Sequence, residues 1–189
     1  QTKKSASSDF IGRGSYDPAS RKLRTTKIRG RETLWGDWAA AHSFVAQVVE
    51  VEVDIKTGQT NLLKMTTVAD SGRIINPLMA TGSLEGAIEM GCGFALTEEP
   101  VIDEKGQTVN PTFLDYKYIT SLDYPVTETV FLETLSPRGA YGAKGAGEVG
   151  LPAVVPAIAN AIFNATGARI REMPITSEKI WKAINLAKA

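Results

Sequence analysis

The sequence contains little of what a metal or disulfide site requires. Its 189 residues include one cysteine, Cys92, and one histidine, His42. A single cysteine excludes an intrachain disulfide framework and any multi-cysteine zinc or iron–sulfur site, and a single histidine excludes a histidine-rich metal site. We therefore expect no metal-ligand set among this chain's own side chains, and a cytoplasmic protein.

Charge of one sign and long apolar runs are also lacking. Lysine and arginine number 21, as do aspartate and glutamate, so no overall field attracts nucleic acid or an anionic membrane. The apolar stretches are far shorter than the roughly 20 residues that cross a bilayer, and no basic region followed by an apolar run opens the chain. These absences predict a soluble, unexported protein that binds neither nucleic acid nor membrane.

The first part of the chain has no hydrophobic periodicity. It begins with Gln1 rather than methionine, and residues 1–27 are polar and rich in serine, arginine and glycine. This pattern indicates a start within a longer polypeptide. We expect residues 1–39 to be an irregular segment that continues from a missing N-terminal part, and residues 40–189 to form one folded domain.

A β-hairpin is predicted at the start of that domain. From Phe44 to Asp54 valines alternate with acidic residues, which is typical of a half-exposed strand. Gly58 then supplies the residue that a tight turn needs, and an extended apolar pattern resumes from Leu62 to Ala69.

A long helix should follow, because Pro77 suits a first helical turn and the pattern runs to about Leu96. Gly82, Gly86 and Gly93 fall on one face of it at 100° per residue. Glycine is unfavourable within a helix, so close helix packing and ligand contact are both open explanations for that face.

The remaining elements alternate irregularly. Strands are expected over 113–120 and 127–134, an apolar helix from Pro152 to Ala165, and a final helix from about Thr176. No regular strand–helix–strand repeat is present. The fold class is therefore α+β, with a mixed sheet, hairpin strands and packed helices.

One glycine-rich segment, RGAYGAKGAGEVGLP from Arg138 to Pro152, contains candidate chemistry. It is not a phosphate-binding Walker loop, because Lys144 is not followed by serine or threonine. It is not a dinucleotide fingerprint either, since no strand–glycine–helix unit with a later acidic partner surrounds it. Two readings remain: a structural glycine loop, or an active-site loop that brings backbone amides and the Glu148 carboxylate close to a bulky ligand.

Several motifs in register resemble one enzyme family. GAKGAGE, the helix PAVVPAIANAI, the closing EMPITSEKIW and the upstream stretch from VEVDIKTGQ to GCGFALTEE look like the C-terminal part of the molybdopterin-binding subunit of the xanthine dehydrogenase and aldehyde oxidase family. The resemblance extends from about Ala40 to the end. It implies that residues 40–189 are a C-terminal molybdenum-cofactor-binding domain of a molybdenum hydroxylase.

The resemblance also implies site residues. The glutamate that closes this loop in the family is the catalytic base, which corresponds to Glu148, and cofactor contacts are expected at Gly82, Ser83, Lys144 and Gly145. The family commonly has glutamine where this chain has Ser83, whose hydroxyl is shorter and has fewer donors. Ser83 therefore either faces the cofactor or packs. The Lys144 ammonium is expected to meet cofactor phosphate or, more simply, solvent.

A molybdenum-dependent oxidoreductase follows from the resemblance, oxidising an N-heterocycle such as a purine, or an aldehyde, with water as oxygen donor. Its cofactor would be molybdenum–molybdopterin in the cytosine dinucleotide form, shared with the rest of the molybdenum subunit. FAD and iron–sulfur clusters would lie on partner subunits of a hetero-oligomer. The alternatives are a reductase similar to 4-hydroxybenzoyl-CoA reductase and a non-catalytic cofactor-binding or assembly module.

Overall fold

The computed structural model describes residues 24–28, 31–35 and 41–186. The contacts divide the chain into two units, Gln1–Ala40 and Ala41–Ala189. In the first unit, β1 (Arg24–Ile28) pairs antiparallel with β2 (Arg31–Trp35). This two-stranded hairpin was not predicted, since the sequence indicated an irregular segment there.

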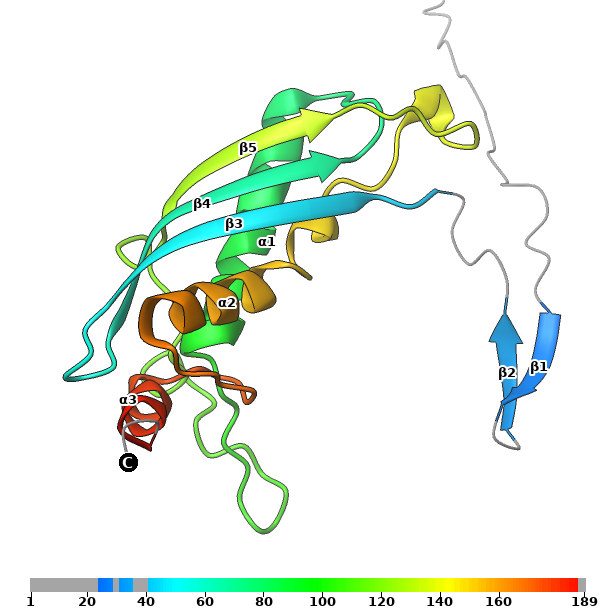
Figure 1. Cartoon of the computed structure of the whole chain (residues 1–189). Helices are drawn as coiled ribbons and strands as arrows, with labels where there is room; N and C mark the ends of the chain where they lie inside the picture. Colours follow the sequence, from blue (N-terminus) through cyan, green and yellow to red (C-terminus); the bar gives the residue numbers. More distant parts are fainter. Residues whose placement is uncertain (1–23, 29–30, 36–40, 187–189) are drawn as a thin grey trace, which may run out of the picture. The chain divides into compact units, whose positions relative to one another are not determined.

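The second unit contains a three-stranded mixed sheet in the order β3-β4-β5 (Figure 1). Strand β3 (Phe44–Val53) pairs antiparallel with β4 (Thr60–Asp70), with a bulge between Glu50 and Val51. The predicted hairpin is thus confirmed, and Gly58 has the positive φ of 77° that its turn requires. Strand β5 (Val126–Leu132) lies parallel to β4, so the predicted mixed sheet is also confirmed.

Two helices cover one face of this sheet (Figure 1). Helix α1 (Pro77–Leu96) begins as predicted: the Asn76 side chain accepts a hydrogen bond from the Met79 amide (3.2 Å), and proline occupies the first turn. Helix α2 (Val154–Thr166) starts two residues after Pro152 and ends at Gly167, whose φ is 74°. Apolar side chains from both helices and the sheet form the core, including Met65, Ile88, Cys92 and Ile158.

The final helix, α3 (Ser177–Leu186), confirms the predicted start and adds Ile180 and Ile184 to the core. The strand predicted over 113–120 is wrong, because residues 113–116 form a turn and a bend and residues 117–120 have no regular secondary structure. The Asp115 and Tyr116 amides both donate to the Thr112 carbonyl, and the Thr112 hydroxyl donates to Asp115. Such local bonds compete with a sheet ladder, and Phe113 is left largely exposed.

One segment among the described residues, Glu148–Thr166, has the length and composition of a membrane span, which corrects the expectation that no such run exists. Its regular part, α2, has 13 residues and is about 20 Å long, shorter than the roughly 30 Å hydrocarbon core of a bilayer. Val154, Ile158 and Ile162 are buried in the protein core. These three side chains place one face of α2 in the core of the domain.

Candidate functional site

The beginning of α1 and the glycine-rich segment form the two walls of a cleft of about 230 Å³. Ser71, Asn76, Met79 and Ser83 line it from the α1 side, and Ala143, Lys144 and Ala146 line it from the other. Two of the residues predicted from the sequence, Ser83 and Lys144, are therefore neighbours of one cleft. They are 61 positions apart in the sequence and are brought together by the end of β4.

Two exposed glycines of α1 lie near Ser83 in the sequence, outside the set of residues that line this cleft. Gly82, Ser83 and Gly86 are exposed, and a Cβ built on either glycine would meet nothing within 4 Å. The expectation of a bare glycine face is therefore right for these two glycines and wrong for Gly93, which is buried against the Glu98 side chain. Ser83 is exposed in this unit, which leaves its side chain free to face a ligand.

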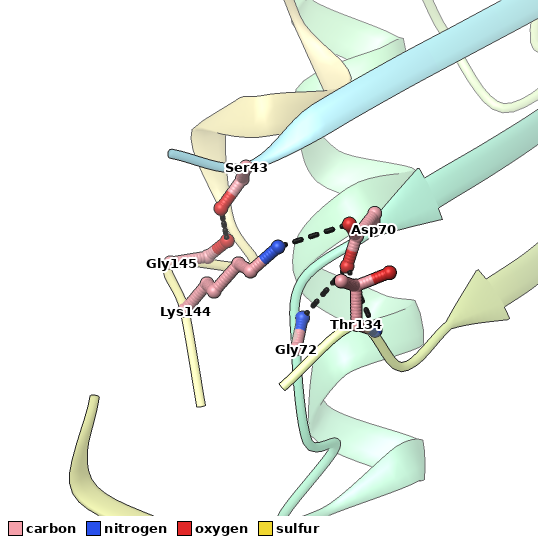
Figure 2. Close-up of polar contacts among 6 residues, drawn as sticks. All are labelled: Ser43, Asp70, Gly72, Thr134, Lys144 and Gly145. Atoms are coloured by element: carbon pink, nitrogen blue, oxygen red, sulfur yellow. Dashed lines mark hydrogen bonds and ion pairs between the residues drawn. The ribbon is translucent and has the colours of Figure 1, made fainter. Parts of the chain in front are cut away.

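The opposite wall is fixed by an ion pair that the sequence did not predict. The Lys144 Nζ lies 2.9 Å from the Asp70 carboxylate, and the two side chains are only 7% and 13% exposed (Figure 2). Asp70 also accepts hydrogen bonds from the Gly72 and Thr134 amides, each 3.2 Å long. The expectation that the Lys144 ammonium lies in solvent is wrong, because Asp70 at the end of β4 binds it.

The charge of Asp70 is stabilised by these contacts. The Lys144 ammonium is the main cause that holds the pKa of Asp70 below its ordinary value, and the Gly72 and Thr134 donors add to this, while burial acts in the opposite direction. Asp70 is therefore an anion at neutral pH. It connects three parts of the chain: the end of β4, the segment after β5, and the glycine-rich wall.

Backbone bonds hold the same wall on either side of Lys144. The Lys144 amide donates to the Ser71 carbonyl (2.9 Å), and Gly72 and Ala143 form an isolated antiparallel bridge. The Ser43 hydroxyl donates to the Gly145 carbonyl over 2.6 Å (Figure 2). The wall from 142 to 145 is thus an ordered strip of backbone.

Glu148 opens a one-turn 3-10 helix, η2 (Glu148–Gly150), directly beyond this wall. Its side chain is exposed, and within residues 41–186 it makes no hydrogen bond or ion pair. A Cβ on the preceding Gly147 would lie 3.9 Å from the Ser83 Cβ, so the backbone just before Glu148 lies beside Ser83. Glu148 is therefore an exposed carboxylate that follows directly on the backbone beside Ser83, a residue of the cleft lining.

The far end of η2 is anchored to the sheet and to α1. Gly150 is buried, and a Cβ there would lie 2.9 Å from Leu84 Cδ2. Its carbonyl accepts a hydrogen bond from Gln47 Nε2 (2.8 Å), and Gln47 also donates to the Thr67 hydroxyl. Gln47 and Asp70 are the functional-site residues that sequence reasoning missed. Asp70 lies within the stretch that resembles the enzyme family, but no role was predicted for it. No neighbouring residue in the sequence marks Gln47 as part of the site.

Metal ligands are not assembled by the described part of the chain, in which no three of the residue types His, Cys, Asp and Glu lie close enough to hold an ion. Cys92 is buried in the core, where desolvation raises the pKa of its thiol to about 12. Cys92 is therefore a small core residue. The cleft can thus contribute hydroxyl and amide groups to a ligand, and no metal-ligand set is found among the described residues.

Comparison with known proteins identifies the family to which this fold and cleft belong. A family model described as the molybdopterin cofactor-binding domain matches residues 4–125, so the chain belongs to that family. The chain is 40% identical over 146 residues to the putative xanthine dehydrogenase molybdenum-binding subunit XdhA of Escherichia coli K12, covering 77% of this chain and 19% of the relative.

Two further relatives extend the comparison. Identity is 41% over 140 residues with the aldehyde oxidoreductase molybdenum-binding subunit PaoC of Escherichia coli K12, covering 73% of this chain and 19% of that subunit. The crystal structure of the aldehyde oxidoreductase from Desulfovibrio desulfuricans has a TM-score of 0.73 at 32% identity, covering 86% of this chain and 17% of that chain. The resemblance stated from the motifs is confirmed, and the chain spans about a fifth of the length of its curated relatives.

Proposed function

We propose that this chain is the part of a molybdenum hydroxylase that supplies one side of the cofactor site and the general base, Glu148. The observation that carries the proposal is the placement of Glu148: an exposed carboxylate with no partner among the described residues, beside the Ser83 cleft, in a segment whose two ends are anchored. A carboxylate without a competing partner is available to take a proton.

The cleft fits the edge of a polar cofactor. The Ser71 hydroxyl borders the cleft, is buried and has no partner among the described residues, whereas buried polar groups are normally paired. Gly82, next to Ser83 in α1, leaves room for close approach. We infer that Gly82, Ser83 and Gly145 contact the molybdopterin cofactor. Lys144 shapes the wall, since its ammonium is bound by Asp70.

When bound, the molybdenum cofactor supplies a two-electron oxidant. The overall reaction converts a substrate C–H bond and water into a C–OH group, two protons and two electrons. In it Glu148 accepts the proton of the attacking water oxygen as the C–O bond forms. Its exposed position next to the cleft allows it to reach a substrate atom without belonging to a metal-ligand set.

The substrate class is an N-heterocycle or an aldehyde. The two bacterial relatives are named for xanthine dehydrogenase and aldehyde oxidoreductase, and the identities to them, 40% and 41%, do not favour one over the other. We further propose the cytosine dinucleotide form of the cofactor, FAD and iron–sulfur clusters on partner subunits, and a cytoplasmic hetero-oligomer. Support comes from the relatives' description as subunits and from the single cysteine of this chain.

The test of the proposed base is Glu148→Gln in the assembled enzyme, which keeps the shape and removes the basicity. Turnover should fall by about 10²–10⁴-fold, because a general base contributes about that factor, while molybdenum content stays at the wild-type level. The wild-type rate should rise with pH through one ionisation that the variant lacks.

The matched control is Glu104→Gln, which changes an exposed carboxylate in the turn between Asp103 and Gly106 and should leave the rate unchanged. Retention of a rate within about threefold by Glu148→Gln would remove Glu148 from the mechanism. An assembled complex that contains molybdopterin but turns over no substrate would favour the non-catalytic module. Reduction of an aromatic thioester would favour the reductase.

A further inference from the structure

The Glu148 side chain makes no hydrogen bond or ion pair within residues 41–186, so its position is set by its backbone. Two anchors bracket it: Lys144, four residues before it, and Gly150, two residues after it. The second anchor is the Gln47 hydrogen bond together with packing on Leu84. The position of the Glu148 carboxylate therefore depends on whether the contacts at Lys144 restrain the backbone as strongly as the contacts at Gly150 do.

The first anchor is the Asp70–Lys144 ion pair. Asp70 accepts from Lys144 and from two backbone amides, at Gly72 and Thr134. Replacing the carboxylate by an amide would leave the shielded Lys144 ammonium without its anion, which costs more than an absent bond would. Because the two side chains are largely shielded from water, salt screens their attraction less than that of an exposed pair.

The same sheet provides a contrasting pair. Lys64 in β4 and Glu128 in β5 also form an ion pair, 2.7 Å long, with side chains that are 40% and 55% exposed. Exposed pairs of this kind contribute little, and this one joins two strands that are already hydrogen-bonded. The Asp70–Lys144 pair instead joins a strand end to a loop whose backbone is paired only locally, through the Gly72–Ala143 bridge and the hydrogen bond from the Lys144 amide to the Ser71 carbonyl.

We propose that Asp70 is a positioning residue for Glu148: by binding Lys144 it holds the segment 143–148 against the start of α1, without touching substrate or cofactor. The effect of Asp70 on catalysis rests on the proposed function of Glu148. The effect of Asp70 on the position of segment 143–148 is independent of that function, because it follows from contacts within this chain.

The experiment compares Asp70→Asn, Lys144→Met and the double variant with the control variants Glu128→Gln and Lys64→Met, all in the assembled enzyme. Amide hydrogen exchange over 143–149 reports the segment directly. Asp70→Asn should raise exchange there by at least about tenfold, and should leave 158–166 in α2 unchanged because the Gln47 anchor remains. The double variant should be less impaired than the sum of the single variants, since neither charge is then left alone.

Kinetics provide the second readout. In Asp70→Asn, kcat should fall about 10- to 100-fold with KM within about twofold, because a displaced base impairs the chemical step more than binding. Unchanged amide exchange over 143–149 in Asp70→Asn would overturn the positioning role, and so would an equal rise of exchange in Glu128→Gln. Both outcomes count whatever the activity of Glu148→Gln is. Raised exchange with wild-type kcat, while Glu148→Gln is inactive, would also overturn it. An active Glu148→Gln variant would instead refute the proposed base.

Discussion

The two halves of helix α1 are both regular helix, but their side chains differ in how far they are exposed. In the first half, Leu78 and Met79 are 84% and 71% exposed, and Gly82, Ser83 and Gly86 are open. In the second half, Ile88 and Cys92 are fully buried. The second half therefore supplies most of the helix's core side chains, although Met90 and Phe94 are exposed, and the first half borders the cleft and is mostly exposed, apart from the buried Leu84.

This difference shows which signals are local and which are not. The helix starts where Asn76 and Pro77 dictate, and glycines occur along its whole length. Their environment depends on what packs against them: Val154 of α2 at Gly91, and nothing within 4 Å at Gly86. A single helix can therefore secure its position through its buried half and leave the other half free for a ligand.

The largest difference between the halves should appear on truncation of an apolar side chain. Ile88→Ala, which removes a fully buried side chain, should lower the free energy of unfolding by about 2–5 kcal/mol. Met79→Ala, in the exposed half, should change it by less than about 0.5 kcal/mol. Urea denaturation of the two variants measures this, and equal losses would contradict the division of the helix.

A smaller effect is expected when alanine replaces a glycine. A Cβ at Gly91 would lie 2.6 Å from Val154 Cβ, so Gly91→Ala should destabilise the protein by about 1–3 kcal/mol. Gly86→Ala should instead stabilise it by about 0.5–1 kcal/mol, because alanine loses less backbone entropy. Thermal melts of the two variants should therefore move in opposite directions, and a shift of both in one direction would show that the two glycines have similar surroundings.

The smallest change in stability is expected at Ser83. Because this side chain is exposed, Ser83→Gln should alter the free energy of unfolding by less than about 0.5 kcal/mol. The glutamine would restore the amide that the family commonly has, so the molybdenum content of the assembled enzyme should equal or exceed that of the wild type. A thermal melt combined with metal analysis checks both expectations. Lower stability with unchanged metal content would instead assign Ser83 to packing.

Local sequence signals predicted most of the fold of the second unit. Alternating valines and Gly58 were sufficient for the β3–β4 hairpin, and Asn76 with Pro77 for α1, because these signals act over a few residues. The failure over 113–120 has a local cause, in which Thr112 and Asp115 close turns that the apolar pattern does not reveal.

The candidate site was less accessible from sequence. Glu148 was selected by resemblance to a family, since a glycine-rich segment alone allows a structural reading. The partner of Lys144 was not predictable, because Asp70 is 74 residues away and only the β4–β5 pairing brings the ends of the two segments together. Gln47 was missed for the same reason: its contact with Gly150 spans 103 residues.

The parallel pairing of β4 with β5 also has a consequence for the order of folding. Strands β3 and β4 are joined by a short turn, whereas residues 71–125 lie between β4 and β5. Closing the longer loop costs more chain entropy, and contacts of large sequence separation slow folding. We therefore expect the hairpin to form early and β5 to join after α1 has docked. The Asp70 anchor, which needs both Thr134 and Lys144, would then be completed among the last contacts of the domain.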